Sequence, residues 1–182
     1  KALQQLGPND RFNIIEFNTG YRKLYAQAMP ASPHYVQKAQ EFVRLLDASG
    51  GTEMLPAIRA ALAPADGVEE VSSTLRQGMF ITDGAVGNEN ALYAEISRTL
   101  GASRLFTVGI GSAPNSWFMR KAAEFGRGTH THIGNLNEVG AKMGQLFEQL
   151  SRPAATNLNV QWPANVEAWP ERMPDLYLGQ PL

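Results

Sequence analysis

The sequence lacks cysteine and long hydrophobic runs, and these two absences exclude several classes of protein. None of the 182 residues is a cysteine, which excludes disulfide bonds, cysteine-ligated zinc sites and thiol catalysis. The longest wholly apolar stretches are only a few residues long, far short of the roughly 20 residues that span a bilayer. We therefore expect no membrane insertion by this segment.

The chain also lacks an excess of charge of one sign and the signatures of common enzymes. It has 16 basic and 17 acidic side chains and a formal net charge of −1, with no local run of Lys and Arg. This balance provides no field to hold a polyanion, so we do not expect nucleic acid as a partner. No G-x-S-x-G, H-E-x-x-H, P-loop or EF-hand motif occurs. We expect that the chain is not an enzyme.

What the sequence does contain is an alternation of short apolar runs and amphipathic segments. The predicted strands lie at residues 11–17, 21–28, 78–82, 104–110 and 129–133. The predicted helices lie at residues 32–46, 52–62, 89–100, 114–125 and 136–150. Strands that alternate with helices favour βαβ units with right-handed crossovers. The pattern predicts the α/β class, as a doubly wound, Rossmann-like and mostly parallel sheet with helices on both faces.

Pro153 ends this alternation. From this residue to the end, the chain carries five prolines and two of its three tryptophans, with one predicted strand at residues 158–162. We expect residues 1–151 to form one domain and residues 152–182 to begin an adjacent β-rich segment. Because the sequence starts at Lys1 and not at a methionine, we expect it to be a piece of a longer protein.

The strongest candidate site combines two loops that follow or precede predicted elements. Asp83 follows a predicted strand, where ligands bind in open α/β sheets, and Thr52 begins a helix after the glycine pair Gly50 and Gly51. A carboxylate and a hydroxyl are hard oxygen ligands of the kind that Mg²⁺ takes. The same residues have an ordinary structural interpretation, with Asp83 and Gly84 as a turn and Thr52 as a helix N-cap.

Four segments, FNIIEF, SGGTEM, FITDG and FTVGIGSAPN, occur in an order and at spacings that resemble a von Willebrand factor type A domain. The resemblance covers residues 1 to about 151. Within that family the sequence is most similar to bacterial proteins of the inter-alpha-trypsin inhibitor heavy chain type, which pair a VIT domain with the type A domain. The resemblance implies a protein-binding or adhesion module of a surface, periplasmic or otherwise exported protein.

In the family, a metal-ion-dependent adhesion site combines a D-x-S-x-S loop, a Thr in a second loop and an Asp in a third. Thr52 matches the second loop and Asp83 the third, while Gly50, Gly51 and Gly84 would shape the loops. The resemblance implies that Mg²⁺, or Mn²⁺ or Ca²⁺, binds there and accepts a Glu or Asp carboxylate from a protein ligand. No D-x-S-x-S motif occurs in the chain, so we expect weak or no metal binding by this segment alone.

The resemblance also implies a sheet of order 3-2-1-4-5-6 whose first, central strand is missing from this chain. The strands at residues 12–17 and 79–82 would then have no neighbour between them. We expect the gap to be filled by an upstream segment that carries D-x-S-x-S, by residues 158–162, or by another copy of the chain. The alternative function is a structural scaffold with a vestigial metal site, packed against the β-rich segment; a phosphotransfer enzyme is a weaker third interpretation.

Two further patterns have a structural interpretation that we favour. Gly109 to Ser112 is similar to a dinucleotide-binding loop, but its third glycine is missing, so we interpret it as a tight turn before a helix. His130 and His132 are two residues apart and would face the same side of a strand, as metal ligands can. Since His34 is the one other histidine and cysteine is absent, we interpret this segment as an exposed edge strand.

Overall fold

A parallel three-stranded sheet lies at the centre of the molecule, which was studied as a computed structural model. The structure describes residues 2–47, 50–63, 75–83, 87–111, 115–151, 153–156, 158–163, 166–167 and 175–177. The sheet is formed by β5 (Gln77–Thr82), β6 (Arg104–Ile110) and β7 (Arg127–Ile133), in that order. β6 is buried along almost its whole length, as expected for the middle strand of a parallel sheet.

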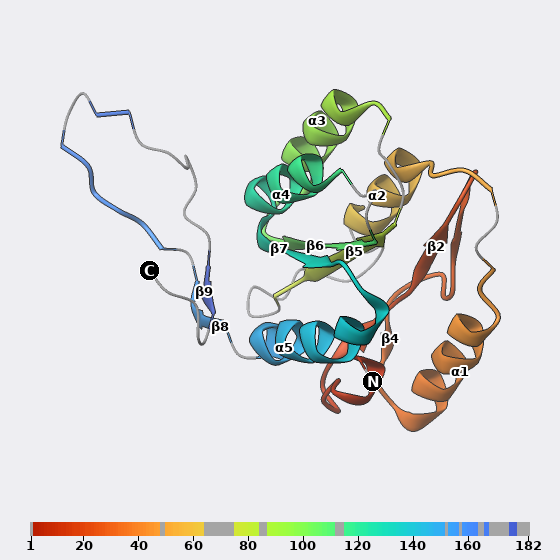
Figure 1. Ribbon diagram of the computed structural model, residues 1–182. Coiled ribbons are helices and arrows are strands. Elements are labelled where there is room, and N and C mark those ends of the chain that lie inside the picture. The colour runs from red at the N-terminus through yellow and green to blue at the C-terminus, as the bar shows by residue number, and fades with distance from the viewer. Residues whose placement is uncertain are drawn as a thin grey trace.

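Helices cover both faces of this sheet. The five α-helices within the described ranges are α1 (Pro33–Arg44), α2 (Met54–Leu62), α3 (Glu89–Thr99), α4 (Ser116–Phe125) and α5 (Val139–Ser151). Figure 1 shows α2, α3 and α4 on one side of β5, β6 and β7 and α5 on the other. Two apolar clusters follow from this arrangement, one around Ile96 and Phe118 under the three helices and one around Val108 and Leu146 under α5.

The N-terminal part adds two short antiparallel pairs. A 3₁₀ turn (Ala2–Gln4) precedes β1 (Arg11–Phe12), β2 (Ile15–Phe17), β3 (Tyr21–Lys23) and β4 (Met29–Pro30). β2 pairs with β3 and β1 pairs with β4. The hairpin predicted around Asn18 is confirmed, because the Asn18 amide donates to the Gly20 carbonyl at 2.9 Å across the turn.

The structure confirms an α/β fold with a parallel sheet, and it leaves β2 and β5 unpaired with each other. No strand of the described ranges bonds to the outer edge of β5 or to the second edge of β2. The rings of Phe17 and Phe80 are stacked across this interval, with centroids 5.1 Å apart. Ile81, which follows Phe80 on β5, is 42% exposed. The missing central strand stays a prediction.

The C-terminal segment returns to the body of the protein. β8 (Pro153–Ala155) pairs antiparallel with β9 (Leu176–Tyr177). The strand predicted at residues 158–162 is wrong, since this stretch has no regular secondary structure; a strand needs hydrogen-bonding neighbours, and none lies beside it in the described ranges. The boundary predicted at residue 151 stays a prediction.

No helix in the described ranges combines the length and apolar character needed to cross a membrane.

Candidate functional site

The loop that carries Thr52 packs against the β2–β3 hairpin. Gly50 has a φ of +95°, a conformation that glycine adopts without strain. A Cβ at Gly50 or Gly51 would stand 3.4 Å from the methyl group of Thr19, so the two glycines allow the loop to approach the hairpin closely. The Glu53 amide then donates to the Asn18 carbonyl at 2.7 Å. These contacts hold the residue before α2 at the end of β2.

Asp83 directly follows β5 at the carboxyl end of the sheet. Its side chain and that of Thr52 are both exposed, and neither makes a hydrogen bond or ion pair within the described ranges. The structure therefore leaves a hydroxyl and a carboxylate available for an external ligand, and no contact joins the two directly. The predicted roles of Thr52, Asp83, Gly50 and Gly51 stay predictions, and Gly84 lies outside the described residues.

The donor set that the chain offers here is small. Within the described ranges, no group of three or more His, Asp or Glu side chains is placed to hold a metal ion. A hydroxyl and one carboxylate are suitable donors for Mg²⁺, but they fill only part of its octahedral shell. The residues therefore fit part of a divalent-cation site and need further oxygen ligands to complete it.

A hollow of about 470 Å³ opens beside this region, on the β2–β3 hairpin. Its lining is polar and consists of Glu16 and residues 18–22. Arg22 donates to the Glu16 carboxylate at 2.7 Å and its guanidinium lies 4.8 Å from the ring centre of Phe42. Sequence analysis predicted the hairpin but not this hollow, because the hollow depends on how the side chains of the hairpin are arranged in space.

The second polar surface lies on β7. His130 Nδ1 is 3.0 Å from Thr107 Oγ1, whose hydroxyl donates to the Met119 carbonyl at 2.8 Å. Because that hydroxyl already donates, we infer that His130 is protonated on Nδ1 and donates to it. Burial lowers the pKa of His130 below its usual value, and the nearby charge of Arg120 acts in the same direction. Both effects favour the neutral form of the imidazole.

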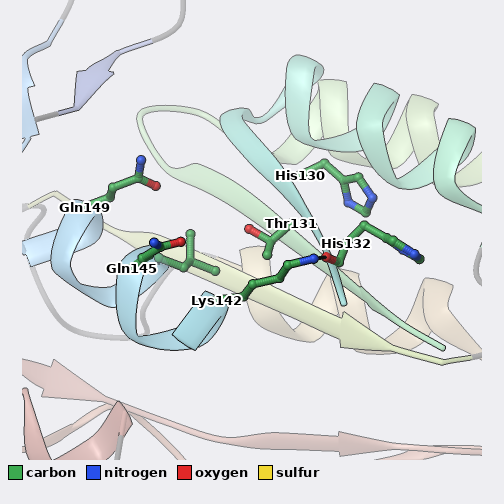
Figure 2. Close-up of a pocket in the computed structure, with 7 residues that line it drawn as sticks. His130, Thr131, His132, Lys142, Gln145 and Gln149 are labelled. Carbon is green, nitrogen blue, oxygen red and sulfur yellow. Dashed lines mark hydrogen bonds between the residues drawn. The ribbon is translucent and has the colours of Figure 1, made fainter. Parts of the chain in front are cut away.

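β7 is the last strand of the parallel sheet in the described ranges, which confirms the predicted edge strand. A groove of about 290 Å³ lies between this edge and α5. Figure 2 shows Lys142, Gln145 and Gln149 of α5 along one side and Thr131 and His132 of β7 along the other. Among the described residues, the two histidines gain no third ligand of metal-binding type. The Gly109 to Ser112 turn lies partly outside the described residues.

A buried ion pair at the opposite end of the sheet escaped sequence analysis. Arg104 at the start of β6 binds Asp175 through Nε and Nη2, and the two side chains are 2% and 1% exposed. Tyr177 is also buried and packs edge-on against Phe106, with ring centres 5.5 Å apart. Burial raises the pKa of Tyr177, and the Asp175 charge adds to this. The only signal in the sequence was a charged residue at the start of an apolar strand.

Comparison with known proteins places this fold among relatives. The family model of the von Willebrand factor type A domain matches residues 1–132. A von Willebrand factor A domain-containing protein of Dictyostelium discoideum is 27% identical over 162 residues, which cover 88% of this chain and 17% of that protein. Human inter-alpha-trypsin inhibitor heavy chain H4 is 26% identical over 175 residues, or 91% of this chain and 19% of that protein. The chain thus spans about a fifth of the length of these relatives.

Solved structures share the fold. A von Willebrand factor type A protein from Catenulispora acidiphila superposes with a TM-score of 0.72 at 22% identity, over 85% of this chain and 37% of that chain. The ArnB paralog VWA2 from Sulfolobus acidocaldarius gives a TM-score of 0.58 at 20% identity, over 96% of this chain and 45% of that chain. At such low sequence identity, these superpositions show a shared fold and nothing about function. The expected VIT domain and bacterial kinship stay predictions.

Proposed function

The chain belongs to the von Willebrand factor type A family, and from this premise we propose that it binds a protein ligand through a divalent cation. The observation that supports the proposal is the state of Thr52 and Asp83. Thr52 is exposed in the loop at the end of β2 and Asp83 at the carboxyl end of β5, and neither makes a hydrogen bond or ion pair within the described ranges. A turn or an N-cap would use these oxygen atoms internally, whereas a ligand site leaves them free.

Under this proposal, Thr52 and Asp83 supply two oxygen ligands to Mg²⁺ or a related cation, Asp83 directly or through water. A D-x-S-x-S loop on a central strand between β2 and β5 supplies the others, from a longer form of the protein. An open position on the cation then accepts a Glu or Asp carboxylate of the partner. The polar hollow on the β2–β3 hairpin lies beside the Thr52 loop and gives that partner a neighbouring contact. The proposed setting is the cell surface, the periplasm or the extracellular space.

Calorimetric titration with Mg²⁺ tests the cation site. We expect weak or no binding by residues 1–182, and measurable binding by a longer chain that includes the upstream loop. In the longer chain, Asp83→Ala should abolish binding, while Glu148→Ala, which removes an exposed carboxylate of α5, should not. Equal binding by both variants would remove Asp83 from the site, and tight binding by residues 1–182 would show that the upstream loop is not needed.

A structural scaffold is the second candidate, and the buried pair of Arg104 and Asp175 favours it. A module whose main role is to hold a neighbouring segment would bury polar contacts with that segment, as seen here. The same titration separates the two functions. If the longer chain binds no Mg²⁺ or Mn²⁺ while its fold is intact, the cation site is vestigial and the scaffold function is the better description.

A further inference from the structure

Residues 158–162 form an amphipathic segment that pairs with no strand of the described ranges. Leu158, Val160 and Trp162 are 37%, 41% and 53% exposed, and they alternate with the polar residues Asn159 and Gln161. A period of two places the apolar side chains on one face of an extended chain and the polar ones on the other. Figure 1 shows this stretch running out from β8, away from the helices and the parallel sheet. The pattern is that of a strand for which the described part of this copy offers no neighbour.

The outer edge of β7 has backbone amide and carbonyl groups that could form hydrogen bonds with an added strand. The Ile133 carbonyl accepts from the Gly111 amide at 2.8 Å and so faces β6. Because backbone groups alternate along a strand, those of His132 and His130 face outward, away from β6. The His132 carbonyl accepts from Lys142 Nζ at 2.7 Å, which protects part of the edge. The His130 amide and carbonyl and the His132 amide face the side on which another strand would pair.

The groove beside this edge has a polar character that suits one face of the segment. Gln145 and Gln149 of α5 line it together with Thr131 of β7, and Figure 2 shows the two glutamines on the α5 side of the groove. Amide side chains donate and accept hydrogen bonds, so Asn159 and Gln161 complement these glutamines. A strand added to β7 would carry its polar face over the groove and its apolar face on the α4 side of the sheet.

The other open position, the interval between β2 and β5, does not suit the segment. A strand there would be central in the sheet and covered on both faces, and such strands are apolar along their whole length. Asn159 and Gln161 would then be buried without assured partners, at a cost of about 1 to 3 kcal/mol each. A strand of alternating polarity instead fits the edge of a sheet, where one face remains in contact with water.

We propose that two copies of the chain associate by reciprocal exchange of residues 158–162, each segment adding as a strand to β7 of the other copy. The partner is thus a second copy of this chain, related by a two-fold axis. The exchange uses main-chain hydrogen bonds for affinity and the groove for specificity. The β8–β9 pair and the buried contact of Asp175 with Arg104 hold both flanks of the segment on its own copy, so the exchange leaves each core intact.

Sedimentation velocity and a spin label test this proposal on residues 1–182. We expect reversible dimerisation across about a hundredfold range of concentration. Since the chain has no cysteine, Glu167→Cys, at an exposed residue just beyond the segment, takes a single spin label. Mixed with an unlabelled, ¹⁵N-labelled copy, it should broaden the amide signals of His130, Thr131 and His132. A monomer at every concentration, broadening around Ile81 instead, or broadening of β7 only within the labelled molecule itself would each overturn the proposal.

A matched pair of variants isolates the strand. Val160→Pro removes an amide and a β-compatible backbone from the segment, and we expect it to weaken the dimer by about tenfold or more. Val160→Thr keeps a β-branched side chain and should leave the dimer within about threefold of the original. Val160 is exposed, so circular dichroism and the unfolding midpoint should not change in either variant. A dimer that Val160→Pro leaves unaffected would contradict strand exchange.

Discussion

The two ends of the parallel sheet differ in whether their polar side chains are exposed or buried in pairs. At the carboxyl end, Asp83 is exposed and makes no hydrogen bond or ion pair within the described ranges, and the same holds for Thr52 in the loop at the end of β2. At the amino end, Arg104 and Asp175 are almost completely buried and bind each other through two hydrogen bonds. Arg104 also donates to the Ala102 carbonyl at 2.6 Å. One end has unpaired polar groups available for a ligand, and the other uses its polar groups within the fold.

This difference separates function from stability along one sheet. A buried charge is tolerated only with a partner, because the unpaired ion would be strongly destabilising. An exposed carboxylate is solvated by water and contributes little to the free energy of unfolding. Substitutions at the amino end should therefore change stability, and substitutions at the carboxyl end should change binding alone.

The largest effect is expected at the buried pair. Asp175→Ala leaves the Arg104 guanidinium buried without its partner, and we expect a loss of about 3 to 5 kcal/mol in the free energy of unfolding. Urea unfolding followed by tryptophan fluorescence measures this loss. The matched control is Asp83→Ala at the exposed end, which should leave the unfolding midpoint unchanged. Similar losses in both variants would break the contrast between the two ends.

A double variant shows whether the pair itself stabilises the fold or only requires its partner. In Arg104→Met combined with Asp175→Leu, both charges are replaced by apolar groups of comparable size. Such replacements are often neutral or stabilising by about 1 to 4 kcal/mol. Recovery of stability relative to Asp175→Ala would show that the single variant suffers from the unpaired charge. No recovery would show that the hydrogen bonds of the pair stabilise the amino end directly.

A smaller effect on the free energy of unfolding is expected at Gly128 and Gly144, two glycines whose surroundings differ. A Cβ at Gly128, near the amino end of β7, would overlap the Leu105 carbonyl oxygen of β6, whereas a Cβ at Gly144 of α5 meets no atom within 4 Å. We expect Gly128→Ala to destabilise by about 1 to 3 kcal/mol, because two backbones must move apart. Gly144→Ala should stabilise by about 0.5 to 1 kcal/mol, since alanine favours a helix. Thermal unfolding of both variants measures the contrast, and equal shifts would contradict it.

Sequence reasoning predicted the order of elements well, because apolar periodicity and helix stops are local signals. Gly126 ends α4 as expected, and the predicted hairpin at Asn18 forms. Sequence reasoning failed where the pairing of strands or side chains depends on segments that are distant in the sequence. Residues 158–162 have strand periodicity but no strand beside them in the described part of the chain. The pairing of Arg104 with Asp175 joins residues 71 positions apart. Thr52 and Asp83 were found through a family motif, and local propensity alone favoured a turn and a cap.

The smallest expected effect lies between the two ends, at His130. Its folded-state pKa is lowered mainly by burial from the usual value of 6.5, so the unfolded chain binds more protons when the pH lies between the two values. Stability therefore rises with pH through this window and falls as the pH drops below the unfolded pKa. His130→Gln should remove this dependence, a change of about 2 °C in Tm between about pH 7.5 and pH 5.5. His132→Gln, at the exposed neighbour on the same strand, should retain it; loss of the dependence in both variants would assign the effect to the edge of β7 as a whole and not to the buried imidazole.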